Sequence, residues 1–273
     1  MRFHLRRKGI FLALGLTLLA LTVLSLGVLL LNYSSRDEES ITILNTLDRM
    51  HELKSSIDRG FFKIFIAKSG IEVNISNQTI EFKENMPNAN NGSLGNALAS
   101  FENFIENNYP QASLDLSTII NEVPLIIMPY NVTYTHKSFG GKELQIEGKG
   151  ISGYTISITI QENVTGCEIE DFDAGSTNLT INAYGTFDTS CTVSQQVDPS
   201  RDTEIEIDGI SDENISVELN NYRMRIRAEG ETKVSSVLKF NGTEPLHIEF
   251  PDSTLSISYP DFNVNMKTGV RVI

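Results

Sequence analysis

Histidines, the side chains that most often bind metals or move protons, are few and scattered in this chain of 273 residues. They are His4, His51, His136 and His247. No two are four residues apart, the spacing at which a pair on one helix face binds zinc. The sequence also has no Gly-x-Ser-x-Gly motif and no phosphate-binding loop. We therefore assign no catalytic residue, no metal ligand and no cofactor, and we expect the protein not to be an enzyme.

Two acidic turns resemble fragments of a calcium-binding loop. Their residues are Asp171, Asp173 and Gly175 in the first turn, and Asp208, Asp212 and Glu213 in the second. Calcium requires about six to eight oxygen ligands from a well-shaped loop, and neither turn supplies that set. Both are predicted to be ordinary acidic turns.

The two cysteines, Cys167 and Cys191, lie in strand-like surroundings rich in threonine. An even count in an exported protein favours one disulfide bond, which at this loop length would stabilise the fold by about 3 kcal/mol. The alternative is a pair of buried thiols. Zinc binding is not predicted, because no further Cys or His lies at ligand spacing nearby.

Asn-x-Ser/Thr sequons, which accept N-linked sugars in exported proteins, are frequent. They begin at Asn32, Asn74, Asn77, Asn91, Asn131, Asn163, Asn178, Asn214 and Asn241. We expect several of them to be glycosylated. The alternative is that they are ordinary polar turns of a chain rich in serine and threonine.

The net charge of −13 limits the class of partner. A surface this acidic repels phosphate backbones, so nucleic acid is not an expected partner. One basic run, Arg223-Met224-Arg225-Ile226-Arg227, places three arginines on one face of a strand. Those arginines could receive an acidic partner or a glycan, although pairing with neighbouring glutamates is the simpler expectation.

The elements that position these residues begin with an apolar run over residues 10–31. As a helix it would be about 33 Å long, enough to cross a bilayer core of about 30 Å. It has no small-residue cleavage site, so a membrane anchor is favoured over a cleaved signal peptide. The basic leader over residues 1–9 and the net negative segment over residues 36–39 place the N-terminus in the cytoplasm and the rest outside.

Residues 32–69 are predicted to form an amphipathic stalk helix, because apolar residues recur at steps of three and four. Only Lys54 interrupts this stripe. No proline occurs before Pro87, so the stalk can continue the apolar helix, with Gly60 as its weak point. The stripe is expected to pack on the rest of the chain, or alternatively on neighbouring subunits.

Residues 70–128 are predicted to be an α/β connecting region with a helix at about 94–108, and residues 129–273 a β-rich extracytoplasmic domain. From Leu144 onward the sequence alternates apolar and polar residues between Gly, Asn, Asp and Pro turns. Closely spaced strands of this kind favour an antiparallel sandwich or barrel. The expected fold class is α+β, with an N-terminal transmembrane and stalk helix before a sandwich-like domain.

The first 60 to 65 residues resemble archaeal type IV pilin-like proteins and pseudopilins. The resemblance rests on a basic leader ending in Lys8-Gly9, followed by an apolar helix that runs into an amphipathic one. It implies cleavage after Gly9, with Ile10 as the new N-terminus, and a helix that could pack with those of other pilin-like subunits. Many bacterial pilins have glutamate at the fifth mature position, which is Leu14 here, so a minor or tip subunit fits better than a major one.

Three functions follow as hypotheses. The first is a non-catalytic, single-pass surface protein like a minor pilin, whose β domain serves assembly or adhesion and could contact surface glycans. The second is a permanently anchored envelope protein that binds a ligand or glycan through a β-sandwich. The third is a membrane-tethered hydrolase, which would need a pocket holding convergent carboxylates or a histidine pair.

Overall fold

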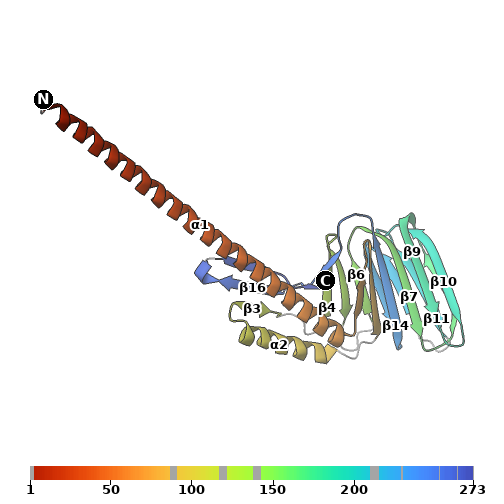
Figure 1. Cartoon of the computed structure of the whole chain (residues 1–273). Coiled ribbons are helices and arrows are strands. Elements are labelled where there is room, and N and C mark those ends of the chain that lie inside the picture. Colours follow the sequence, from red (N-terminus) through yellow and green to blue (C-terminus); the bar gives the residue numbers. More distant parts are fainter. Residues whose placement is uncertain are drawn as a thin grey trace. The chain divides into compact units, whose positions relative to one another are not determined.

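The fold is mixed α and β with mostly antiparallel sheets (Figure 1). The computed structural model describes residues 3–86, 91–116, 122–137, 143–209, 215–228, 230–251, 253–262 and 264–272. The chain divides into two compact units, which are described separately. The first is Met1–Glu52 with Tyr259–Val264, and the second is Leu53–Ser258 with Asn265–Ile273.

The first unit consists mainly of the N-terminal part of helix α1 (Phe3–Ser69). No proline interrupts this segment, and its leucine-rich sequence has high helix propensity. The hydroxyls of Thr22 and Thr46 are satisfied within the helix, donating to the carbonyls of Leu19 and Thr42 at 2.8 Å. The last turns of α1, from Leu53 onward, belong to the second unit.

The second unit contains a sheet that has six strands in the described part of the chain. Its strands, in spatial order, are β1 (Glu72–Ile75), β2 (Thr79–Met86), β14 (Thr232–Phe240), β7 (Ile151–Ile160), β9 (Ala174–Tyr184) and β10 (Ser190–Val197). All neighbours pair antiparallel except β7 and β9, which are parallel. Alternate side chains are buried, as along β14, where Val234, Leu238 and Phe240 point inward.

A second sheet has nine strands among the described residues. In spatial order they are β18 (Arg271–Val272), β15 (His247–Glu249), β4 (Glu122–Met128), β5 (Val132–Lys137), β6 (Glu143–Glu147), β13 (Arg223–Ala228), β12 (Ile215–Asn220), β11 (Thr203–Gly209) and β8 (Val164–Asp171). Consecutive strands such as β11, β12 and β13 pair antiparallel with an unbroken register. This local connectivity follows from the alternation of apolar and polar residues in the sequence.

Aromatic side chains join the two sheets. The rings of Phe82 on β2 and Tyr134 on β5 stack with centroids 3.8 Å apart, and both residues are completely buried. Tyr130, in the turn after β4, stacks on Phe240 of β14 with centroids 4.7 Å apart. Such buried aromatic pairs add stability beyond the area that they remove from water.

Helix α2 (Asn91–Asn108) coincides with the helix expected at about 94–108 and begins earlier. It packs against the C-terminal turns of α1, where Gly60 lies beside the ring of Phe101. A Cβ atom on residue 60 would stand 3.1 Å from Phe101 Cζ, so the missing side chain allows the two helices to approach closely. Gly60 therefore serves packing within a continuous helix.

Strand β3 (Ala112–Asp115) follows α2 and pairs with β16 (Thr254–Tyr259) in a third sheet, which β17 (Val264–Thr268) completes. The short helix η1 (Pro260–Phe262) precedes β17. Phe250, just before this sheet, lies edge-on to Phe61 and Phe65 of α1, with centroids 5.2 and 6.0 Å away. These rings hold the end of α1 against the β-rich part of the second unit.

Candidate membrane anchor and surface sites

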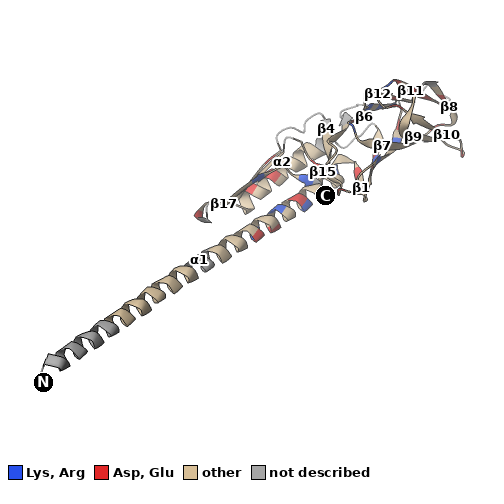
Figure 2. Ribbon diagram, turned by 90° about the horizontal axis from the view of Figure 1, so that it is seen from above, with Lys and Arg blue, Asp and Glu red and all other residues tan. Residues whose placement is uncertain are grey.

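The apolar segment Thr17–Ser34 of α1 is long and apolar enough to cross a membrane. None of its 18 residues is buried, and Leu24 and Leu31 are 68% and 72% exposed. Figure 2 shows no charged residue along this stretch. Its place near the N-terminus also fits a signal sequence. Gly9 and Ile10 lie in the helical backbone of α1, but their side chains are outside the described part of the chain.

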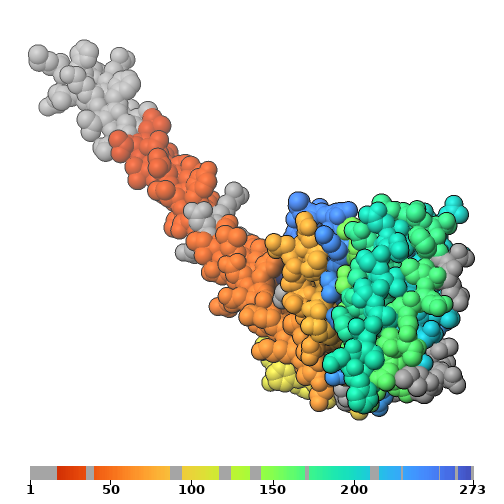
Figure 3. Space-filling view, turned by 90° about the vertical axis from the view of Figure 1, so that its right-hand side faces the viewer, coloured from red at the N-terminus to blue at the C-terminus, as the bar shows by residue number. Residues whose placement is uncertain are grey.

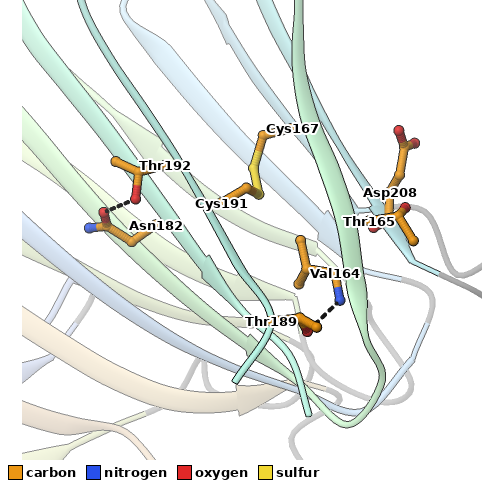
Figure 4. The surroundings of a disulfide bond; sticks show 8 residues. All are labelled: Val164, Thr165, Cys167, Asn182, Thr189, Cys191, Thr192 and Asp208. Carbon is orange, nitrogen blue, oxygen red and sulfur yellow. Dashed lines mark hydrogen bonds between the residues drawn. A yellow bond between two sulfur atoms is a disulfide. The ribbon is translucent and has the colours of Figure 1, made fainter. Parts of the chain in front are cut away.

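A disulfide bond joins Cys167 of β8 to Cys191 of β10, with 5.9 Å between their Cα atoms. That separation is within the usual range for disulfides, about 4.4 to 6.8 Å. The two strands lie at the ends of different sheets, so the bond ties the sheets together at one side (Figure 4). Nearby, the Thr189 hydroxyl accepts a hydrogen bond of 3.0 Å from the Val164 amide. The disulfide indicates an oxidising, extracytoplasmic compartment.

The outward-facing side chains of β7, β9 and β10 form a surface without formal charge, which we name the neutral face. Its residues are Thr155, Ser157, Thr159, Asn178, Thr180, Asn182, Tyr184, Ser190, Thr192, Ser194 and Gln196. They line up in rows across the three strands, as in the row Ser157, Asn182 and Thr192. In Figure 3 the teal surface of β9 and β10 is broad and open to solvent.

Hydrogen bonds between neighbouring strands order the neutral face. Thr192 donates to the amide oxygen of Asn182 at 3.2 Å, and the hydroxyls of Thr180 and Ser194 are also 3.2 Å apart. Tyr184, 46% exposed, adds an aromatic ring at one end. Such a surface can exchange hydrogen bonds and stack on a sugar ring, but it offers no group for catalysis. Sequence reasoning missed the neutral face, because the pairing of β7 with β9 is visible only in three dimensions.

In contrast to the uncharged neutral face, the outer side of the nine-stranded sheet is charged. There the three arginines of β13 are paired with glutamates. Arg225 lies 3.1 Å from Glu143 and 3.2 Å from Glu218, and Arg227 lies 2.6 Å from Glu218. Arg223 forms a similar bond of 2.8 Å with Glu147. The expected pairing with neighbouring glutamates is therefore confirmed. These arginines are largely neutralised, which weakens their case as a binding site for an anion.

The residues considered for metal binding or catalysis form no cluster of three ligands within the part of the chain that the structure describes. His247 lies 3.4 Å from Glu249, and Asp173 is exposed beside β9. The side chains of His136 and Asp171, and the residues Asp212 and Glu213, lie outside the described residues. Within the described ranges, no group of three His, Cys, Asp or Glu side chains could hold a metal ion.

The sequon asparagines have different surroundings. Among those with described side chains, the exposed ones are Asn32, Asn74, Asn77, Asn131, Asn178 and Asn241. Asn163 is half-buried, and its amide oxygen accepts a hydrogen bond of 2.7 Å from Thr186. Asn214 and the side chain of Asn91 lie outside the part of the chain that the structure describes. Exposure alone thus separates Asn163 from the other described sequons.

The described residues of the second unit form open hollows whose walls are partly polar and partly apolar. One of about 350 Å³ lies among β2, β7 and β14, with Lys83, Ser157 and Lys233 at its wall. Beside it, Glu81 has a pKa below its ordinary value. Partial burial raises this pKa, but hydrogen bonds from Lys83, Ser235 and Asn74 together outweigh that effect. A carboxylate held ionised in this way fits a structural role better than proton transfer.

In comparisons with known proteins, the chain matches no protein-family profile, no curated protein and no solved structure.

Proposed function

We propose that this chain is a non-catalytic, single-pass membrane protein whose β-rich part is displayed outside the cell for assembly or adhesion. The observation that carries the proposal is the apolar segment Thr17–Ser34, which has no buried residue and precedes a disulfide-bonded β unit in the same chain. An apolar surface of this size is unstable in water and requires lipid or other apolar helices around it. The basic leader supports a cytoplasmic N-terminus.

The finer form of the proposal is a protein resembling a minor pilin or pseudopilin. It is supported by the order of a basic leader, an apolar helix and a β-rich unit. In this form the leader is removed after Gly9, so that Ile10 becomes the N-terminus, and the apolar helix anchors the chain and contacts those of other subunits. The two large sheets then act as a β-sandwich, joined by stacked rings such as Phe82 and Tyr134.

The decisive experiment is N-terminal sequencing of the protein recovered from membranes, together with extraction at alkaline pH. We expect the chain to resist extraction and to begin at Ile10. The Leu24→Arg variant should insert poorly, because a charge at the centre of a membrane helix costs about 2.5 to 3.5 kcal/mol. Leu24→Val is the matched control and should stay in the membrane. Recovery of the wild-type chain in the soluble fraction would contradict the proposal.

A second candidate is a permanently anchored module that binds a neutral glycan, and it is favoured by the neutral face of β7, β9 and β10. Hydroxyl and amide groups exchange hydrogen bonds with sugars, and the exposed ring of Tyr184 can stack on one. N-terminal sequencing separates the candidates, because a permanent anchor keeps Met1. Tyr222 lies in the turn between β12 and β13 of the nine-stranded sheet, away from the neutral face, and serves as the control. Loss of glycan binding in Tyr184→Ala, with binding retained in Tyr222→Ala, would support the second.

A further inference from the structure

We propose that Asn77 and Asn241 carry N-linked oligosaccharides that flank one hollow at an end of the second unit. The inference rests on the proposed extracytoplasmic location and deepens it by naming the modified residues. It starts from a convergence that the sequence does not reveal. Two sequons separated by more than half of the chain meet at the same place in the fold.

Backbone hydrogen bonds bring the two segments together. Phe240, at the end of β14, donates its amide to the carbonyl of Gln78 at 2.9 Å. The side-chain amide of Gln78 in turn donates to the carbonyl of Gly242 at 3.0 Å. Gln78 and Gly242 are the middle residues of the two sequons, so each sequon is held beside the other.

The two sequons share the wall of a hollow of about 550 Å³. Its lining residues are Ile75, Ser76, Asn77 and Gln78 from one segment, and Gly242, Thr243, Pro245 and Leu246 from the other. The lining combines apolar groups with amides and hydroxyls, a mixture that suits a sugar ring with its apolar face and polar edge. The first sugars attached to either asparagine therefore have a surface on which to pack.

The loop that carries Asn241 packs against the aromatic ring of Tyr130. Tyr130 stacks on Phe240, and its hydroxyl occupies the space where a side chain at position 242 would lie. A Cβ atom there would be 1.8 Å from the Tyr130 oxygen, so only glycine fits. Asn241, next to this glycine, is exposed and turned away from the packed core.

Two other sequon asparagines have side chains that are already hydrogen-bonded. The side chain of Asn74 is hydrogen-bonded to Glu81, which lies opposite it in the sheet. Asn163 is half-buried and bonded to Thr186, whose backbone amide also donates to the carbonyl of Glu162 at 2.7 Å. A transferase needs the asparagine amide to be accessible, and the exposed turns that carry Asn77 and Asn241 meet that requirement.

The modification is a group transfer performed by a membrane-bound oligosaccharyltransferase on a lipid-phosphate-linked oligosaccharide. The side-chain nitrogen of asparagine forms a bond to the anomeric carbon of the first sugar. The bond from that carbon to the phosphate oxygen breaks, the lipid phosphate leaves, and the amide loses one proton. No electron transfer is involved, and the transferase and its donor are the only co-reactants.

Mass spectrometry of peptides from the full-length protein, purified from the membranes of the organism that makes it, tests the inference. We expect added sugar mass on the peptides that contain Asn77 and Asn241, and none on the peptide that contains Asn163. Thr243→Val should remove the sugar from Asn241 while Asn77 keeps its own. Thr243→Ser preserves the sequon and should keep both.

Bare Asn77 and Asn241 in protein that is membrane-bound and disulfide-bonded would overturn this inference and leave the proposed function standing. Sugar on only one of the two would also overturn it, because the paired arrangement would then be absent. Sugar retained on Asn241 in Thr243→Val would show attachment by a different chemistry and would equally count against it. Failure of the proposed function has a separate readout, namely recovery of the chain from the soluble fraction.

Discussion

The phenol of Tyr134 on β5 donates a hydrogen bond to the carboxylate of Glu84 on β2, across the contact between the two large sheets. Tyr134 is completely buried and Glu84 is only 4% exposed. Burial, reinforced by the neighbouring Glu84 charge, raises the pKa of Tyr134 well above its ordinary value. The hydrogen on the phenol is therefore retained over the whole physiological pH range.

Replacement of this phenol tests how much the polar contact contributes. Tyr134→Phe keeps the ring that stacks on Phe82 and removes only the donor to Glu84. We expect the free energy of unfolding to fall by about 1 to 3 kcal/mol, the usual cost of removing a hydrogen-bond donor from a buried acceptor. Urea denaturation measures it. The double variant Tyr134→Phe with Glu84→Gln should recover part of the loss, and an unchanged midpoint in the single variant would contradict the assignment.

The disulfide makes a second prediction. Cys167→Ser with Cys191→Ser should lower the free energy of unfolding by about 3 kcal/mol, because the bond closes a loop of intermediate length in the unfolded chain. Thermal unfolding with and without reductant provides the measurement. The wild type should shift on reduction, whereas the double variant should not. Equal stability of oxidised and reduced wild type would be inconsistent with a stabilising role.

A third prediction follows from the contact between Gly60 and Phe101. Gly60→Leu forces a side chain into space that the Phe101 ring already occupies, and overpacking of this kind costs about 1 to 3 kcal/mol. Phe101→Ala should relieve part of that cost in the double variant, and the stability of all four proteins forms a double-mutant cycle. Strictly additive effects of the two substitutions would show that the residues do not meet.

A fourth prediction concerns pH. Asp198 accepts two hydrogen bonds from Ser200, one from its hydroxyl at 2.7 Å and one from its backbone amide at 2.9 Å. These bonds hold the pKa of Asp198 below its ordinary value of 3.8. The folded state is thus favoured above the unfolded pKa, and this contribution is lost as pH falls through the lower folded pKa.

NMR measures this titration directly. The Ser200 amide resonance should move with a midpoint below 3.8. In Asp198→Asn, which keeps an acceptor but cannot ionise, the same resonance should no longer follow that transition. A midpoint at or above the ordinary aspartate value would contradict the described turn.

Much of the strand pattern could be predicted from the sequence, because alternation of apolar and polar residues encodes which side of a strand is buried. The segments around Leu144, Ile156 and Ile226 were recognised in this way and form β6, β7 and β13. Strand β1 and strand β2 were assigned to a connecting region, yet β2 pairs with β14, more than a hundred residues later. Local pattern carries no information about such distant partners.

Charged residues within apolar stripes also have distant partners that the local sequence pattern does not reveal. Lys54 interrupts the stripe of α1, and the structure gives the reason, since its amine lies 2.5 Å from the buried carboxylate of Asp58. Asp58 also accepts the backbone amide of Arg271 at 3.3 Å. A partner from the far end of the chain could not have been inferred from the helix sequence. The convergence of Asn77 and Asn241 was hidden for the same reason.

The contrast between the two outer sheet surfaces has a consequence for the salinity at which the protein can work. The ion pairs around Arg225 and Glu218 weaken as dissolved ions screen them, over a distance of about 8 Å at 0.15 M. Hydroxyl and amide groups such as those of Thr180 and Asn182 carry no charge to screen. Binding of a partner to the neutral face should therefore be nearly as strong at high salt as at low salt. Binding through the arginines of β13 should weaken as the salt concentration rises.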